Sequence, residues 1–123
     1  MSEEKTILIA EDDFSLNRLI SFKLKKEGYL VISTADGEAA LRAALNENIA
    51  AAIIDIMMPY LDGIQVLKKI RSEKPHLPVI ILSVKSRKTD LHQAYELGAN
   101  DYISKPFQPE ELIKRLKELI GDN

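Results

Sequence analysis

The sequence predicts an α/β fold in which a doubly wound, five-stranded parallel sheet carries helices on both faces. Short apolar runs alternate with longer amphipathic stretches along the 123 residues, and turn residues separate them. This alternation is typical of repeated βα units, whose right-handed crossovers make the strands parallel. No linker, internal repeat or low-complexity tract interrupts the pattern. We therefore expect a single domain over residues 1–123.

Five short apolar segments are the expected strands. They cover residues 6–10, 30–34, 50–55, 78–83 and 101–104. The third is an unbroken apolar run up to Asp55, as in a strand buried on both faces, whereas the second is expected at an edge. For five such strands the order 2-1-3-4-5 is a common solution.

Five amphipathic stretches between and after these strands are the expected helices. They cover residues 15–27, 37–47, 63–73, 89–97 and 109–120. The apolar face expected for the first helix consists of Leu16, Leu19, Ile20 and Leu24. Gly28, Gly98 and Gly121 stand where helices should end, and Pro109 suits the first turn of the last helix.

The composition excludes several classes of protein. Lys and Arg number 17 against 19 Asp and Glu, and a net charge of -2 argues against direct binding of nucleic acid or an anionic membrane. Without cysteine there is no disulfide framework or thiolate metal site. The N-terminus begins acidic, unlike a signal peptide, and no apolar run approaches the ~20 residues of a membrane span. We expect a soluble cytoplasmic protein with a specific partner.

Polar side chains gather where the predicted strands end. They are Glu11, Asp12 and Asp13 after the first strand, Asp55 ending the third, Ser83 ending the fourth, Ser104 ending the fifth, and Lys105 directly after it. In a sheet of this order ligands bind beyond the carboxyl ends of the strands, between the first and third strands. We therefore expect these side chains to share one site.

The residue types at this edge indicate phosphoryl-transfer chemistry. Carboxylates that lie close together repel one another unless a cation neutralises them, and Mg²⁺ prefers such oxygen ligands. No HxxxH pattern or cysteine pair favours a softer metal. A metal, a lysine and a hydroxyl around one aspartate suit phosphoryl transfer to a carboxylate nucleophile. Asp55 is therefore expected to meet Mg²⁺ and then a phosphoryl group.

These residues resemble the receiver domain of two-component response regulators, including the small chemotaxis-type regulators of flavodoxin-like topology. The motifs are ILIAEDD, IIDIMMPYLDG, PVIILSV and GANDYISKPF, in this order along the chain. Four motifs in order at the ends of four strands make the resemblance specific. It covers essentially the whole chain.

The resemblance implies a role for each residue of the acidic pocket. Asp55 is similar to the phosphorylated residue, and Asp12 to the acid that binds Mg²⁺ directly. Glu11 would act through water, and the backbone carbonyl of Met57 would be a third protein ligand. Asp13 competes with Glu11 for the water-mediated role, and each acid also suits the cap of the following helix.

The remaining motifs imply the switch residues. Ser83 resembles the hydroxyl that bonds the phosphoryl oxygen, and Lys105 the lysine that pairs with carboxylate and phosphate. A cis proline usually follows that lysine, here Pro106. Tyr102 stands at the aromatic position whose rotamer reports activation.

The resemblance therefore implies a phosphorelay signalling switch. A sensor histidine kinase or phosphotransfer protein would donate the phosphoryl group, and the surface of the fourth helix, fifth strand and fifth helix would change for an effector or fused output domain. The chain would catalyse only its own phosphorylation and dephosphorylation, so it is not expected to be a metabolic enzyme. No output domain is expected in this sequence, and a phosphorylation-dependent dimer is compatible with it.

Three alternatives share parts of this pattern. A pseudo-receiver would bind partners without phosphorylation, and Val84, where the family usually has alanine or glycine, favours it. A phosphatase of the haloacid dehalogenase type needs a second aspartate two residues after the first, where this chain has Met57. A flavin mononucleotide module needs a hydroxyl-rich phosphate loop, where this chain has three acids.

Overall fold

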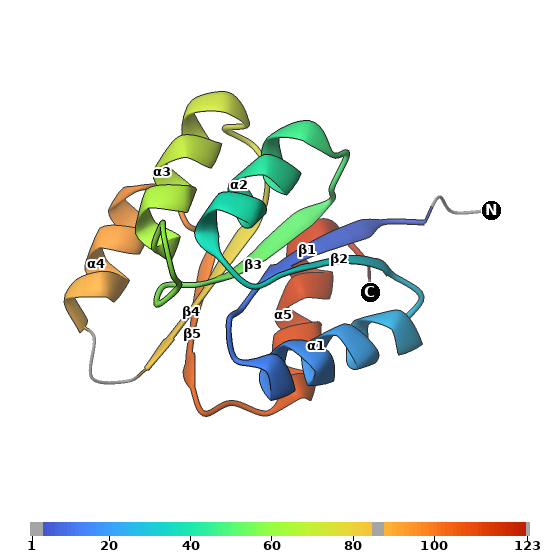
Figure 1. Cartoon of the computed structure of the whole chain (residues 1–123). Coiled ribbons are helices and arrows are strands. Elements are labelled where there is room, and N and C mark those ends of the chain that lie inside the picture. Colours follow the sequence, from blue (N-terminus) through green and yellow to red (C-terminus); the bar gives the residue numbers. More distant parts are fainter. Residues whose placement is uncertain (1–3, 85–87, 123) are drawn as a thin grey trace.

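The computed structural model describes residues 4–84 and 88–122, whose arrangement is shown in Figure 1. Within them five strands form one sheet: β1 (Thr6–Ala10), β2 (Leu30–Thr34), β3 (Ala51–Asp55), β4 (Val79–Val84) and β5 (Asp101–Lys105). The helices between and after them are α1 (Phe14–Lys26), α2 (Gly37–Asn46), α3 (Gly63–Glu73), α4 (Lys88–Glu96) and α5 (Pro109–Ile120). The strands pair in parallel in the order β2-β1-β3-β4-β5. The predicted fold class is confirmed, and every predicted bound lies within one residue of the observed one.

The helices cover both faces of the sheet. Figure 1 shows α1 and α5 on one face and α2, α3 and α4 on the other. Because side chains alternate along a strand, Ile53 packs into the core under α1 and α5 while Ile54 packs into the opposite core. The apolar β3 is thus buried from both sides, and Asp55 ends it at the rim of the dry interior.

The first helix differs from its predicted packing. Its buried residues are Asn17, Ile20 and Leu24, whereas Leu19 is 41 % exposed, so the prediction that Leu19 lies on the buried face is wrong. Positions 17, 20 and 24 are three and four residues apart and share one face of a helix with 3.6 residues per turn. Leu19 lies to one side of this face, where it lines a surface cavity together with Lys105.

Side chains and a glycine cap the helix ends, and of these caps the sequence predicts Asp13 and Gly121. The Asp13 carboxylate caps α1 by accepting the backbone N–H of Leu16 at 3.1 Å, and Asp62 forms a capping box with Gln65 at α3. The chain leaves α5 through Gly121, whose φ of 77° lies in the left-handed region that glycine adopts without strain.

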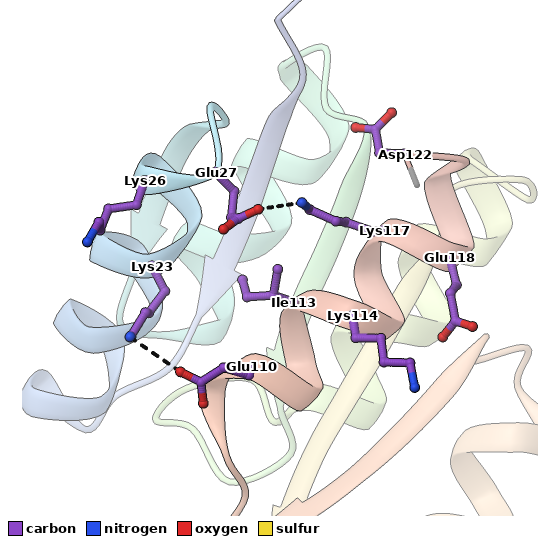
Figure 2. Close-up of a pocket in the computed structure, with 9 residues that line it drawn as sticks. All are labelled: Lys23, Lys26, Glu27, Glu110, Ile113, Lys114, Lys117, Glu118 and Asp122. Carbon is purple, nitrogen blue, oxygen red and sulfur yellow. Dashed lines mark hydrogen bonds and ion pairs between the residues drawn. The ribbon is translucent and has the colours of Figure 1, made fainter.

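A groove of about 510 Å³ lies between α1 and α5 (Figure 2). Lys23 pairs with Glu110 across it at 3.4 Å, and Lys117 pairs with Glu27. None of the predicted site residues lines this groove. Its partly exposed ion pairs add little to the packing of the two helices, whose buried side chains belong to one core cluster. In the described part of the chain, no helix combines the length and apolar character needed to cross a bilayer.

Candidate functional site

The carboxyl ends of the central strands bring the predicted acids together. Asp55 is the last residue of β3 and is 3 % exposed, and Glu11, directly after β1, is 1 % exposed. Asp12 follows Glu11 and is exposed. One carboxylate oxygen from each of these three acids lies within 4.8 Å of the others. The parallel register of β1 and β3 produces this cluster, because both strands end at the same edge.

Lys105 supplies the cation that the buried carboxylates require. Its Nζ lies 2.8 Å from Oδ2 of Asp55 and 2.7 Å from Oε1 of Glu11. The other oxygens of the two acids accept backbone N–H groups, Asp55 Oδ1 from Met57 at 3.2 Å and Glu11 Oε2 from Asp13 at 3.0 Å. Each buried carboxylate is thus fixed at one oxygen by the lysine and at the other by the main chain.

Burial and the neighbouring charges together shift the pKa values of Glu11 and Lys105. Burial raises the pKa of Glu11 to about 7, although its contacts with Lys105 and the Asp13 N–H oppose the shift. Burial alone would lower the pKa of Lys105, but its hydrogen bond to Asp55 and its ion pair with Glu11 outweigh burial and raise it. Lys105 therefore stays protonated between the two acids.

The donor set fits a hard divalent cation. Three carboxylates around one ammonium group leave excess negative charge when all are ionised, and carboxylate oxygens are the ligands that Mg²⁺ prefers. Asp13 lies outside this group of three acids because its carboxylate caps α1. Glu11, Asp12 and Asp55 are thus the acids positioned to hold such an ion.

A buried hydroxyl lies at the end of the neighbouring strand. Ser83 in β4 is 1 % exposed, and within residues 4–84 and 88–122 its Oγ has no hydrogen-bond partner. Burying a hydroxyl without a partner costs free energy, so this group is available to an acceptor that enters the site. Val84 follows it, is 43 % exposed, and lines a cavity with Lys105.

The other predicted residues lie around this edge. The Lys105–Pro106 peptide bond is cis, as the resemblance implies. Tyr102 is half-buried in β5 and packs against the core under α2, α3 and α4. The side chain of Met57 is exposed, and its N–H group bonds to Asp55.

Sequence reasoning missed two residues that shape this site. A Cβ atom on Gly63 would overlap the carbonyl oxygen of Asp55 and lie 2.8 Å from Cα of Ile56. Gly63 lets α3 begin directly against the end of β3, and its N–H donates to the Ile56 carbonyl at 2.8 Å. The second residue is Asn17, a polar side chain on the buried face of α1. The spacing of Gly63 after Asp55 is visible in the sequence, but its close approach to the strand is not.

Comparison with known proteins places this chain in a family. The family model of the response regulator receiver domain matches residues 7–117. The chain is 40 % identical over 116 residues to the alkaline phosphatase synthesis transcriptional regulatory protein PhoP of Bacillus subtilis, covering 94 % of this chain and 48 % of PhoP. It is 46 % identical over 113 residues to the response regulator GtcR of Aneurinibacillus migulanus, covering 92 % and 46 %. The chain therefore spans about half the length of these curated relatives.

Solved structures show the same fold. A CheY-like receiver domain protein from Methanospirillum hungatei superposes with a TM-score of 0.93 at 28 % identity, covering 98 % of this chain and 96 % of that one. The receiver domain of a sensor histidine kinase from Pseudomonas aeruginosa, with a magnesium ion coordinated in its active-site cleft, superposes with a TM-score of 0.88 at 32 % identity, covering 97 % and 99 %. The matched motifs, fold and relatives together show that this chain belongs to the family of response regulator receiver domains.

Proposed function

We propose that this receiver domain is a switch in which Asp55 accepts a phosphoryl group from the phosphohistidine of a sensor histidine kinase or a phosphotransfer protein. The observation that carries the proposal is the buried Asp55 carboxylate, held by Lys105 and the Met57 N–H beside Glu11 and Asp12. A carboxylate whose two oxygens are held in place by neighbouring donors is a preorganised nucleophile.

The reaction is an exchange of one phosphorus bond for another. A carboxylate oxygen of Asp55 attacks phosphorus, and an O–P bond forms as the P–N bond to the donor imidazole breaks. The electron pair of that bond remains on the imidazole nitrogen. Lys105, 2.8 Å from the carboxylate, offers its charge to the phosphoryl oxygens as they arrive.

The acid cluster would hold Mg²⁺ for this reaction. We assign its direct carboxylate contacts to Asp12 and Asp55, a water-mediated contact to Glu11 and a backbone contact to the Met57 carbonyl. When bound, Mg²⁺ neutralises negative charge on the phosphoryl oxygens. The close approach of three carboxylates, two of them buried, supports this assignment.

The phosphorylated state would be detected through Ser83 and Tyr102. The buried Ser83 hydroxyl would donate to a phosphoryl oxygen, and Tyr102 would respond in the adjacent strand β5. The surface of α4, β5 and α5 would then favour a second arrangement that an effector protein, a fused output domain or a second copy of the chain recognises. The product of this chemistry is a changed surface, so we propose a signalling role and no metabolic turnover.

Intact-mass spectrometry after incubation with acetyl phosphate tests the proposal. We expect one added phosphoryl group on the native chain with Mg²⁺, none without it, and none on Asp55→Asn. Asp101→Asn removes an acid at the amino end of β5, away from the carboxyl ends of the strands, and should be phosphorylated like the native chain. If the native chain carries no adduct and forms no Mg²⁺-dependent beryllofluoride complex, it acts as a pseudo-receiver and our proposal is wrong.

A further inference from the structure

We propose that Asn17 is a positioning residue that fixes the loop carrying Glu11 and Asp12, an inference that rests on the proposed function. Asn17 is 7 % exposed and lies on the same buried face of α1 as Ile20 and Leu24. Asparagine is a poor helix former, and its amide is costly to bury without partners. An apolar residue would fill this helix position without these costs, so the contacts of the amide indicate why it is here.

The amide nitrogen of Asn17 joins the ends of two strands. Its Nδ2 donates to the carbonyl oxygen of Glu11 at 2.9 Å and to that of Thr34 at 3.0 Å. The Thr34 carbonyl also accepts the backbone N–H of Glu11 at 3.1 Å. One side chain on α1 therefore ties the residue after β1 to the end of β2.

The amide oxygen fixes the orientation of this side chain. Asn17 Oδ1 accepts the hydroxyl of Ser33 at 2.5 Å and that of Ser21 at 3.3 Å. Hydroxyl donors meet the oxygen and carbonyl acceptors meet the nitrogen, so only one orientation of the amide satisfies all four contacts. Such a fully bonded buried polar group is specific to one local structure.

These contacts hold the acidic loop from both sides. The Glu11 main chain is bonded through its N–H to Thr34 and through its carbonyl to Asn17, while the Asp13 carbonyl accepts the Asn17 backbone N–H at 2.9 Å. Asp12, the exposed acid, lies between these two fixed residues. The position of its carboxylate relative to Asp55 therefore depends on the amide of Asn17.

Magnesium affinity, measured by calorimetry on the folded and unphosphorylated chain, tests this role. Groups that hydrogen-bond to metal ligands and orient them contribute about 10- to 100-fold to metal affinity. We therefore expect Asn17→Ala to weaken Mg²⁺ binding about 10-fold. Asn17→Leu should weaken it by a similar factor, because an apolar side chain of similar size cannot donate to the Glu11 and Thr34 carbonyls and adds no charge near the metal. In the absence of metal, the backbone N–H of Glu11 should exchange faster in the Asn17 variants than in the native chain.

Asn100→Ala is the matched control. Asn100 also uses its side-chain amide to bond the main chain, accepting the Val79 N–H at 2.9 Å. This contact lies at the amino ends of β4 and β5, away from the acidic cluster. Its loss should lower stability and leave Mg²⁺ affinity within about twofold of the native value. If Asn17 acts in stability alone, Asn17→Ala should also lower stability and leave Mg²⁺ affinity within about twofold of the native value.

The outcomes separate this inference from the proposed function. If the native chain shows no Mg²⁺ binding that Asp12→Asn removes, the proposed function fails whatever Asn17 does. If the native chain binds Mg²⁺ at that site and folded Asn17 variants bind it equally well, the role of Asn17 is overturned. Should both Asn17 variants fail to fold, Ser33→Ala removes the donor that orients the amide, and unchanged Mg²⁺ affinity in that variant also overturns it.

Discussion

Lys105 and Asp55, fifty residues apart in the sequence, form an ion pair of 2.8 Å at the carboxyl ends of β5 and β3. The same ammonium group lies 2.7 Å from Glu11, so one cation serves two buried acids. This sharing leaves the cluster short of positive charge when both acids are ionised. The site therefore has the negative charge to bind a second cation. The two cations together would then attract an anionic group.

Replacing Lys105 should change Mg²⁺ binding and phosphoryl transfer in opposite directions. Lys105→Gln removes a positive charge beside the acids, so we expect Mg²⁺ to bind more tightly and acetyl phosphate to phosphorylate the chain at least ~10-fold more slowly. Calorimetry and the rate of adduct formation measure the two effects. Lys114→Gln, on the exposed side of α5, is the control. Phosphorylation at the native rate in Lys105→Gln would show that the lysine does not assist the transfer.

The close contact between α3 and β3 makes Gly63 sensitive to any side chain. In Gly63→Ala the new methyl group would overlap the Asp55 carbonyl, and we expect a loss of about 1–3 kcal/mol in unfolding free energy together with weaker Mg²⁺ binding. Gly121→Ala meets no atom within 4 Å and should cost roughly 1 kcal/mol through its backbone conformation alone. Urea unfolding and Mg²⁺ titration of both variants check this. Equal Mg²⁺ affinity in Gly63→Ala and Gly121→Ala would show that the contact between α3 and β3 does not position the metal ligands.

The buried hydroxyl of Ser83 predicts an unusual pair of effects. Because its Oγ lacks a partner among the residues that the structure describes, Ser83→Ala should leave the unmodified chain as stable as the native one or more stable. The same variant should lose the change in Tyr102 fluorescence or chemical shift that beryllofluoride induces. Ser104→Ala in β5 is the comparison. A marked loss of stability in unmodified Ser83→Ala would indicate that the hydroxyl is already bonded.

The end of α5 predicts a dependence of stability on acid pH. Asp122 accepts hydrogen bonds from Lys5 at 2.6 Å and from Tyr29 at 3.0 Å, and these contacts hold the pKa of its carboxyl below the ordinary 3.8. A lowered folded-state pKa stabilises the fold above the ordinary value, and this contribution is lost as the pH falls through the lowered one. Asp122→Asn should therefore be less stable than the native chain near pH ~7, and the gap should narrow below about pH 4. Urea unfolding across this range measures the gap. A gap that is constant with pH would contradict the assignment.

The order of elements is predictable because each signal in the sequence is local. The unbroken apolar run before Asp55 marks a strand buried on both faces, and Gly98 and Gly121 adopt positive φ at the helix ends, as the sequence predicts. The rule that parallel strands share an edge then brings Asp55, Glu11 and Lys105 together from the order of the strands alone. Their convergence within hydrogen-bonding distance agrees with that expectation.

The parts that sequence reasoning missed depend on contacts between distant segments. Periodicity places Leu19 inside and gives no role to Asn17, because hydrophobic patterns assign a polar side chain to solvent by default. The partners of Asn17 are a carbonyl six residues earlier and another seventeen residues later, and only the folded chain brings them together. Asp13 is ambiguous in the sequence for a similar reason, since the same carboxylate suits a metal or a helix cap until its distance to Leu16 is known.

The most direct test of the central claim is to locate the phosphoryl group on the chain. Borohydride reduces an aspartyl phosphate to homoserine, so reduction after incubation with acetyl phosphate and Mg²⁺, followed by peptide mass spectrometry, marks the modified residue. We predict homoserine at position 55 and native aspartate at positions 12 and 13. Homoserine at another aspartate, or unmodified Asp55 in a chain whose intact mass shows the adduct, would contradict the proposed role of Asp55.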